Sequence, residues 1–246
     1  MRIAIVSDIH GNLIAFETVL DSVAAEEVDQ IVCLGDVAAG AAQPAETVAR
    51  LRAIGGPVVM GNADAEVLDP ASTPATDETT RRIKEMTAWA ASQLADDDLG
   101  DLRAFQPTVE IALDDDGLLV GCHGSPRSFN DQMLTTTPTG ELDAMLATIP
   151  TATTIVASGH THQQGLRRYR GLLLLNPGSV GLPFHPVPPS EPIFNPAWAE
   201  YAIVTTDRGA LSVDLRRVPI DLDALIRVTR GSDMPHAEWW IGDWRR

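Results

Sequence analysis

The first 60 residues alternate between short apolar runs and stretches with helical periodicity, and this alternation constrains the fold more than any other feature. Residues 3–6 form a continuous apolar run, after which apolar residues recur at helical spacing from Leu13 to Val23. The same order returns with an apolar run at 31–34, a helical stretch at 45–54 and a third run at 57–60. This order of strand, helix, strand, helix and strand predicts a parallel sheet.

The remainder of the chain predicts a second sheet that contains antiparallel hairpins. After a predicted helix at 79–94, the expected elements are hairpins at 109–113 with 118–122, 166–169 with 172–175 and 201–205 with 210–215, helices at 141–146 and from Asp221, and a strand at 154–158. The proline-rich segment 182–196 is predicted to be a loop, which could form one wall of a site or cover a sheet edge. The pattern therefore predicts an α/β fold with two sheets.

Polar residues follow five of the apolar strand candidates at their carboxyl ends. In open α/β folds the carboxyl ends of the strands are where ligands bind. Alternate residues on an extended segment point the same way, so each Asp-x-His or His-x-His pair can turn both side chains toward one pocket. The five segments are Asp8-Ile9-His10, Gly35-Asp36, Gly61-Asn62, Gly121-Cys122-His123 and Gly159-His160-Thr161-His162.

The side chains in these segments suit divalent metal ions. Carboxylate, imidazole and amide oxygen together favour borderline ions such as Mn, Fe, Zn, Ni or Co, and four histidines make Mg alone a poorer fit. The two cysteines, Cys33 and Cys122, lie in apolar runs and are expected to be buried thiols rather than ligands or a disulfide framework. The sequence therefore predicts a site without thiolate ligands.

The five segments resemble, in order and residue type, the motif series of the calcineurin-like metallophosphoesterases, and the resemblance spans residues 1–181. Asp8-Ile9-His10-Gly11-Asn12 and Asn176-Pro177-Gly178-Ser179-Val180-Gly181 are most similar to the small bacterial and archaeal branch that hydrolyses phosphodiesters. The resemblance implies a four-layer αββα sandwich of two mixed sheets flanked by helices. We expect residues 1–246 to form a single domain of this kind, with the proline-rich loop at 182–196 and a C-terminal hairpin, helix and tail.

The same resemblance implies a binuclear metal centre of seven residues. Asp8, His10 and His162 would bind one divalent ion, Asn62, His123 and His160 would bind the other, and Asp36 would bridge the two. Manganese is favoured among the candidate metals, and a hydroxide bridging the ions would attack phosphorus in line. Asp36, His123 and His160 are the expected catalytic residues. The expected function is hydrolysis of a small phosphoester, a phosphodiester or nucleotide above all.

The sequence departs from the family pattern at Ala63. Many members of the family have a histidine after the metal-binding asparagine, which helps to stabilise the transition state or to protonate the leaving group. Alanine can do neither, so a contribution of typically ~10²- to 10⁴-fold must come from elsewhere. Asp64, which would orient that histidine, is then expected to lack its partner. The departure predicts a preference for phosphodiesters or activated esters.

Two alternative functions come from different classes of protein. The first is a protein-binding scaffold with the metallophosphoesterase fold and weak catalysis, which Ala63 leaves open and the complete ligand set argues against. The second is a binuclear amidohydrolase. Such enzymes place His-x-His on the first strand of a barrel of eight βα units, whereas the first strand here ends in Asp-x-His and the chain lacks eight βα units.

Several other residues have plainer interpretations. Asn12 is expected to cap the helix after it, and Arg127 is more readily a solvated arginine than a phosphate ligand. Residues 114–116 are interpreted as part of a hairpin turn rather than as a calcium site. Trp239, Trp240 and Trp244 in the C-terminal tail are expected to pack on their own domain rather than to form a surface for a partner. His185 and His236 lie outside the predicted ligand set.

The charge and hydropathy of the chain limit its partners. The formal net charge is -16, which repels polyanions, so non-specific nucleic-acid binding and binding to an anionic membrane are not expected. The N-terminal apolar stretch is too short for a signal peptide and no later run reaches membrane-spanning length. A cytoplasmic location is the resulting expectation, and the oligomeric state is left open.

Overall fold

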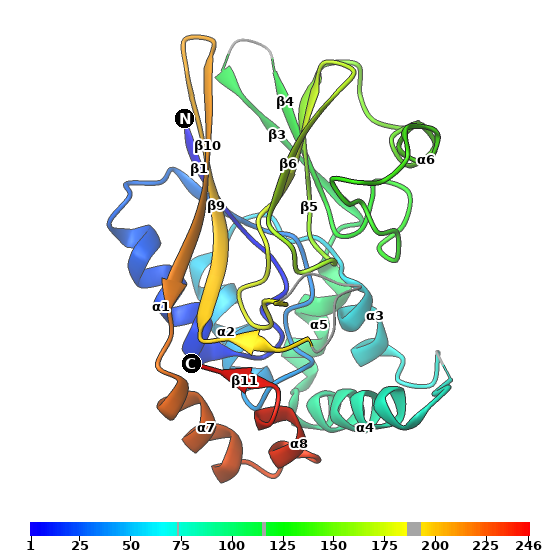
Figure 1. Ribbon diagram of the computed structural model, residues 1–246, viewed down its shortest axis with the longest axis vertical. Helices are drawn as coiled ribbons and strands as arrows, with labels where there is room; N and C mark the ends of the chain where they lie inside the picture. The colour runs from blue at the N-terminus through cyan, green and yellow to red at the C-terminus, as the bar shows by residue number, and fades with distance from the viewer. Residues whose placement is uncertain (73, 115–116, 186–192) are drawn as a thin grey trace.

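Two sheets face each other in the computed structural model, which describes residues 1–72, 74–114, 117–185 and 193–246 (Figure 1). The first sheet has the order β10-β9-β1-β2 and the second the order β3-β4-β5-β7-β6. The strands of the first sheet are β1 (Arg2–Val6), β2 (Gln30–Cys33), β9 (Trp198–Asp207) and β10 (Ala210–Pro219). Those of the second are β3 (Thr108–Ala112), β4 (Leu118–Cys122), β5 (Thr153–Ser158), β6 (Gly165–Tyr169) and β7 (Leu172–Asn176).

Both sheets are mixed, as the sequence predicts. Strand β1 pairs in parallel with β2 and antiparallel with β9, while β4 and β5 pair in parallel beside the β3–β4 hairpin. The third apolar run, residues 57–60, is not a full strand. It forms only the isolated bridges Cys33–Val58 and Val59–Gln106. The expectation of a third parallel strand was wrong in extent, although the chain does run beside β2 there.

Alternation along β1 shows how the layers are held together. Ile3 and Ile5 point into a core between the two sheets, whereas Ala4 and Val6 belong to a second core on the helical side of the first sheet. Successive side chains of a strand point to opposite faces, so a continuous apolar run serves a strand that is buried on both. Cys122, Val156 and Leu174 likewise face a third core on the outer side of the second sheet.

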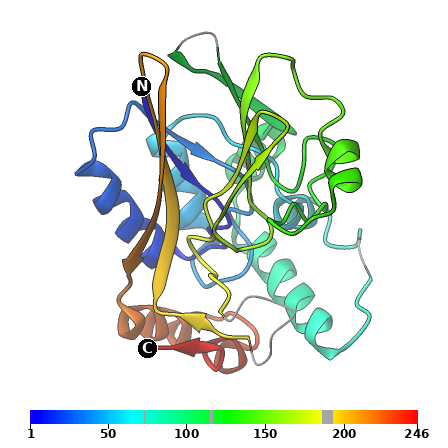
Figure 2. The same cartoon turned by 45° about the horizontal axis from the view of Figure 1, so that its top comes forward.

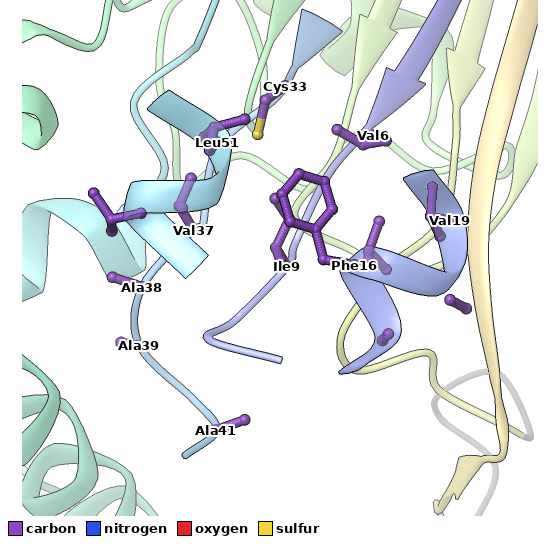
Figure 3. Packing of buried hydrophobic residues seen from close by; sticks show 14 of the residues in the cluster. Val6, Ile9, Phe16, Val19, Cys33, Val37, Ala38, Ala39, Ala41 and Leu51 are labelled. Atoms are coloured by element: carbon purple, nitrogen blue, oxygen red, sulfur yellow. The ribbon is translucent and has the colours of Figure 1, made fainter. Parts of the chain in front are cut away.

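Helices cover the outer face of each sheet and complete the αββα sandwich that the family resemblance implied. The core on the helical side of the first sheet includes residues of α1 (Leu13–Ala24), α2 (Pro44–Ile54), α3 (Asn62–Leu68), α4 (Glu78–Gln93), α5 (Asp96–Ala104), α7 (Leu222–Gly231) and α8 (Ala237–Ile241). Helix α1 contacts β9 and β10 directly, whereas α4 packs on α2 and α3, and α8 packs on α7. Figure 3 shows Phe16 and Val19 of α1 within that core, to which Val6 and Cys33 also belong. Helix α6 (Thr139–Met145) covers the second sheet on the far side of the molecule (Figures 1 and 2).

The C-terminal tail packs on its own chain, as expected. Trp240 and Trp244 are 5% exposed and belong to the same core as α1. Trp244 also lies in β11 (Trp244–Arg245), which pairs in parallel with β8 (Asn195–Pro196) at the end of the proline-rich segment. Residues 186–192 of that segment, and residues 115–116 of the expected Asp-rich turn, lie outside the described part of the chain.

Three smaller expectations can be compared with the structure. Asn12 accepts a hydrogen bond from the Ala15 N–H at 3.1 Å and so caps α1, and both cysteines are buried free thiols. The described strands form two open main sheets and a short third one, which rules out the eightfold barrel of the amidohydrolases. Across the described residues, every helix lacks either the length or the apolar character to cross a membrane.

Candidate metal centre

The predicted ligands meet where β1, β2, β4 and β5 end. Asp8 and His10 follow β1, Asp36 follows β2, and Asn62 is the first residue of α3. Two groups of ligand atoms converge within 4.8 Å: one comprises Asp8, His10 and His162, and the other comprises Asp8, Asp36 and His123. The carboxyl ends of strands from two facing sheets therefore supply one cluster of buried side chains.

The backbone of these segments is not extended. Asp8, His10, Asp36, His160 and His162 all have φ between 54° and 66°, the left-handed region that side chains other than glycine rarely adopt. The side chains thus converge because each segment turns sharply after its strand, and the expectation that they alternate along an extended segment was wrong. Such strained residues cluster at functional sites, where each costs of order 1–3 kcal/mol.

Glycines next to the ligands allow the backbone to pass close, as the sequence suggested. A Cβ atom on Gly61 would overlap both the carboxylate and the backbone nitrogen of Asp36. A Cβ on Gly159 would overlap the hydroxyl of Ser7, with the Asp8 carboxylate next to it. Glycine is required at these two positions by close approach rather than by a positive φ.

Backbone carbonyls fix the tautomer of three histidines. The Nδ1 of His10 lies 2.6 Å from the Ala39 carbonyl oxygen, that of His162 lies 2.6 Å from the Leu182 carbonyl, and that of His123 lies 2.7 Å from the Leu34 carbonyl. A carbonyl oxygen can only accept, so each Nδ1 carries the hydrogen and donates it. In its neutral form, each of these imidazoles presents the lone pair of its Nε2 to the cluster, as metal-binding histidines do.

These lone pairs face other acceptors. The Nε2 atoms of His10 and His162 are 3.1 Å apart, and the Nε2 of His123 lies 3.0 Å from the Asn62 amide oxygen. Acceptors at such distances repel unless a cation or a proton lies between them. Nitrogens that share one ion at about 2.0–2.1 Å are also separated by roughly 3 Å. The donor set and its spacing therefore fit divalent metal ions.

Two carboxylates lie between the histidines. The Oδ2 of Asp36 is 3.3 Å from the Nε2 of His123 and 3.6 Å from the Nε2 of His10, so it reaches both groups. The Oδ1 of Asp8 is 3.3 Å from the Nε2 of His162 and 4.0 Å from that of His123. Asp8 is held by the backbone N–H of His160, and Asp36 by the N–H of Ala63 at 2.8 Å. Either carboxylate is placed to contact two ions.

The proton affinities of the cluster reflect this crowding of negative charge. Burial alone would lower the pKa of His123, but the carboxylates of Asp36 and Asp8 raise it to about 10. Burial would raise the pKa of Asp36, yet His123 and His10 hold it well below its usual range. His162 and Asp8 form a second pair in which burial is again outweighed, so the pKa of His162 is raised and that of Asp8 is lowered.

His160 and His10 differ from the other two histidines. Burial and the neighbouring His123 lower the pKa of His160, and burial lowers the pKa of His10 despite the nearby Asp36. The ring of His160 lies 5.1 Å from that of His123, but its nitrogens belong to neither converging group. The structure therefore brings six of the seven predicted ligands into direct contact and leaves His160 at the edge of the cluster.

Asp64 has partners that the sequence did not suggest. Its carboxylate accepts backbone hydrogen bonds from Asp36 and Val37 at 2.8 Å each and from Gly61 at 3.1 Å. The sequence predicts that Asp64 has no histidine partner at position 63, and the structure shows that backbone N–H groups bind its carboxylate instead. Burial and the charge of Asp36 raise the pKa of Asp64 to about 6. This buried side chain, in the first turn of α3, joins the loop that carries Asp36 to Gly61, the residue before Asn62.

Other contributors to the site were missed. The ring of Phe184 stacks on that of His162, with centroids 4.4 Å apart and planes at 20°. Ser179 donates its hydroxyl to the Asp8 carbonyl at 2.8 Å and so supports the turn after β1. Its only signal in the sequence is the Asn176–Gly181 motif. Arg127 bonds to Asp131 at 2.7 Å, in agreement with its interpretation as a loop arginine.

The fold and the cluster together define the class of protein: an αββα sandwich that gathers histidine, carboxylate and amide ligands where its strands end. Residues 1–196 match the model of the calcineurin-like phosphoesterase superfamily domain. The chain therefore belongs to the calcineurin-like phosphoesterase superfamily, which confirms the resemblance found in the sequence. The family implies divalent metal ions and supports hydrolase activity on phosphoesters.

Known structures share the fold over nearly the whole chain. The metallophosphoesterase from Sphaerobacter thermophilus has a TM-score of 0.73 and 24% identity, covering 99% of this chain and 97% of that one. The hypothetical protein PH1004 from Pyrococcus horikoshii OT3 has a TM-score of 0.74 and 18% identity, covering 98% and 96%. A 66-residue segment is 41% identical to the uncharacterized protein MJ0912 of Methanocaldococcus jannaschii and spans 27% of each chain.

Proposed function

We propose that the protein is a binuclear metal-dependent phosphodiesterase for small phosphodiesters or nucleotides. Asp8, His10 and His162 would hold one divalent ion, with Asn62, His123 and His160 for the other and Asp36 between them. The observation that carries the proposal is the set of Nε2 lone pairs that face other acceptors at 3.0–3.1 Å. A cation in each of these positions removes the repulsion, and manganese is the ion we favour.

When bound, the ions supply a water-derived nucleophile at neutral pH and positive charge for the phosphoryl oxygens. Residues of the chain orient the side chains that would hold these ions. The carbonyls of Ala39, Leu182 and Leu34 fix the imidazole rings of His10, His162 and His123, so each ring keeps its Nε2 toward the cluster of metal ligands. The carboxylate of Asp64 ties the loop that carries Asp36 to Gly61, the residue before Asn62.

Ala63 favours diesters whose leaving group departs readily. It offers only its backbone N–H, which donates to Asp36, and has no side-chain proton for a departing alkoxide. A leaving group that is stable as an anion does not need that proton. Robust hydrolysis of alkyl monoesters by metal-loaded protein, with none of diesters, would contradict this preference.

The experiment that tests the proposal combines metal analysis with a substitution at the bridging position. The purified protein is expected to bind about two Mn ions per chain and to hydrolyse bis-p-nitrophenyl phosphate. Asp36→Asn removes the carboxylate charge proposed to lie between the two ions, so we expect lost metal and at least a 100-fold lower turnover. Asp101→Asn on α5, outside the cluster, is the matched control. Turnover that survives Asp36→Asn would refute the proposed site.

A further inference from the structure

A cavity of about 400 Å³ opens directly beside the candidate metal centre. His10, Asn62 and His162 line the end at the centre. The remaining wall comes from α3, α4, the loop after Gly181 and the C-terminal helix α8. The volume of the cavity is typical of a small-molecule site. When the phosphorus of a phosphoester lies at the metal ligands, one of its ester groups can lie in the cavity.

Apolar and aromatic side chains form most of this wall. Phe184 is half-buried, stacks on His162 and lines the cavity. Trp239 is also half-buried, and Ile83 is 45% exposed although it is a large hydrophobic residue. Aromatic side chains beside a phosphate-binding centre are the usual platform on which nucleobases stack. These residues therefore favour a flat, aromatic group over an alkyl chain.

Ala63 also lines the cavity. The histidine expected at this position would project into the same space, so the small side chain leaves room next to Asn62. Alanine in place of histidine at position 63 therefore has two effects: the site lacks a proton donor, and the ester group has more space. This second effect could not be read from the motif alone.

A buried amide in the wall adds polar specificity. Asn195 is 7% exposed and lines the cavity, yet its amide oxygen has no hydrogen-bond partner among the described residues. An unpaired buried acceptor is destabilising, and a ligand that brings an N–H group would satisfy it. The charged side chains of the described lining are Glu66 and Asp243, with no Lys or Arg. Lys84 lies 3.5 Å from the Glu66 carboxylate, and the Arg82 guanidinium lies 5.5 Å from the centre of the Trp239 ring, so cations balance part of this charge. The feature of the wall that selects a ligand is therefore the unpaired acceptor of Asn195, which favours N–H donors.

We infer that this cavity binds the nucleobase of a nucleoside phosphodiester, with Phe184 and Trp239 as the apolar platform and Asn195 as the acceptor for an exocyclic amino group. The inference rests on the proposed phosphodiesterase for the chemistry, but base binding itself does not require turnover. It makes nucleotides with an amino-bearing base the substrate class. Simple aryl diesters would occupy the platform and leave Asn195 unpaired.

Binding of nucleosides tests the inference apart from catalysis, because a nucleoside has no phosphoester to hydrolyse. Adenosine, guanosine and cytidine are titrated into Mn-loaded protein by calorimetry, with purine riboside as the analogue of adenosine that lacks the amino group. At least one amino-bearing nucleoside should bind saturably. Adenosine should bind about tenfold more tightly than purine riboside. Absence of binding by all three amino-bearing nucleosides would overturn the inference.

Two variants locate the binding. Ile83→Glu places a charge at an exposed position of the wall and should weaken nucleoside binding about tenfold or more, while Leu166→Glu on β6 is the matched control at 41% exposure. Asn195→Leu should abolish the preference for adenosine over purine riboside. It should not reduce stability, because it removes an unpaired acceptor. An unchanged preference in Asn195→Leu would overturn the assigned role of this residue.

Hydrolysis separates failure of the inference from failure of the proposed function. Wild-type protein should prefer adenosine 5′-(4-nitrophenyl) phosphate to methyl 4-nitrophenyl phosphate in kcat/KM, and Ile83→Glu should reduce that ratio about tenfold. Hydrolysis of both diesters with equal efficiency, with no nucleoside binding, would leave the phosphodiesterase and refute the base pocket. Saturable nucleoside binding without hydrolysis of either diester would support the pocket and refute the phosphodiesterase.

Discussion

Uptake of the first divalent ions by metal-free protein at pH 7 should release at least one proton. His123 is the source, because Asp36 and Asp8 raise its pKa to about 10 against the effect of burial. The proton occupies the Nε2 that faces Asp36 and the Asn62 oxygen, so in metal-free protein it relieves the same repulsion that an ion would relieve. A metal can bind this nitrogen only after the proton has left.

The size of the effect follows from the difference between the pKa of His123 and the pH. A pKa of about 10 at pH 7 lowers the apparent metal affinity of this nitrogen by about 10³-fold, or ~4 kcal/mol. Each unit of rising pH up to 10 should therefore improve the affinity about tenfold. His10 and His160 have lowered pKa values and are neutral at pH 7, so they contribute no proton.

Calorimetric titration with Mn in buffers of different ionisation enthalpy measures the number of protons released. The expected number for wild-type protein is one from His123, with a further contribution from His162, whose pKa is also raised. His123→Asn should still bind an ion at Asp8, His10 and His162 and should release about one proton fewer. His185→Asn lies outside the cluster and should match the wild type. Heats that do not depend on the buffer would refute the proton-linked cluster.

Three further predictions concern stability and turnover. In urea unfolding, the free energy of unfolding of metal-free protein should fall as the pH rises from 6.5 through 10, because the raised pKa of His123 is passed in this range. It should also fall below pH 3.8, where the lowered pKa values of Asp36 and Asp8 are approached. A profile that does not change with pH would contradict the assigned shifts. Gly61→Ala overlaps Asp36 and should cost about 1–3 kcal/mol in unfolding free energy with loss of metal, whereas Gly100→Ala in α5, with no atom within 4 Å of its added Cβ, should be neutral or stabilising. Ala63→His should raise turnover of diesters with poor alkoxide leaving groups, since the ring supplies a proton, and should weaken adenosine binding, since the ring occupies the cavity. Methyl 4-nitrophenyl phosphate, whose phenolate leaves without a proton, should gain little, and an unchanged turnover of the alkoxide diesters would discredit the missing-acid account.

Much of the fold could be predicted because its central strands, such as β1 and β5, are buried on both faces. Such strands appear as continuous apolar runs that end abruptly in polar residues, as at Val6–Ser7–Asp8. The run at 57–60 gives the same signal but forms only isolated bridges, since apolarity reports burial and not the extent of pairing. Helix α5 was missed because Asp96, Asp97 and Asp98 suggest a polar loop. Asp98 in fact accepts the Ala95 N–H at 3.0 Å, as an acidic residue in a first helical turn can.

The ligand types of the site could be predicted from the sequence, but their geometry could not. The carbonyls of Ala39, Leu34 and Leu182 orient the histidines through the backbone, which carries no signature in side-chain identity. The cavity wall joins Ile83 of α4 to Trp239 near the C-terminus, residues whose proximity depends on the packing of distant helices. The tail tryptophans were correctly expected to pack on their own chain. Their relation to the metal ligands required the structure.

The energetics of the cluster argue that it binds metal ions rather than serving only as a surface for another protein. Five of the nine non-glycine residues with positive φ in the described chain are candidate ligands, at a cost of order 1–3 kcal/mol each. Acceptors that face each other between His10 and His162 add a further penalty wherever neither a cation nor a proton lies between them. A surface that only binds another protein gains nothing from either feature, because both lie in a buried cluster. A divalent ion removes the repulsion between the facing acceptors, and the strained turns bring the ligand atoms within reach of that ion.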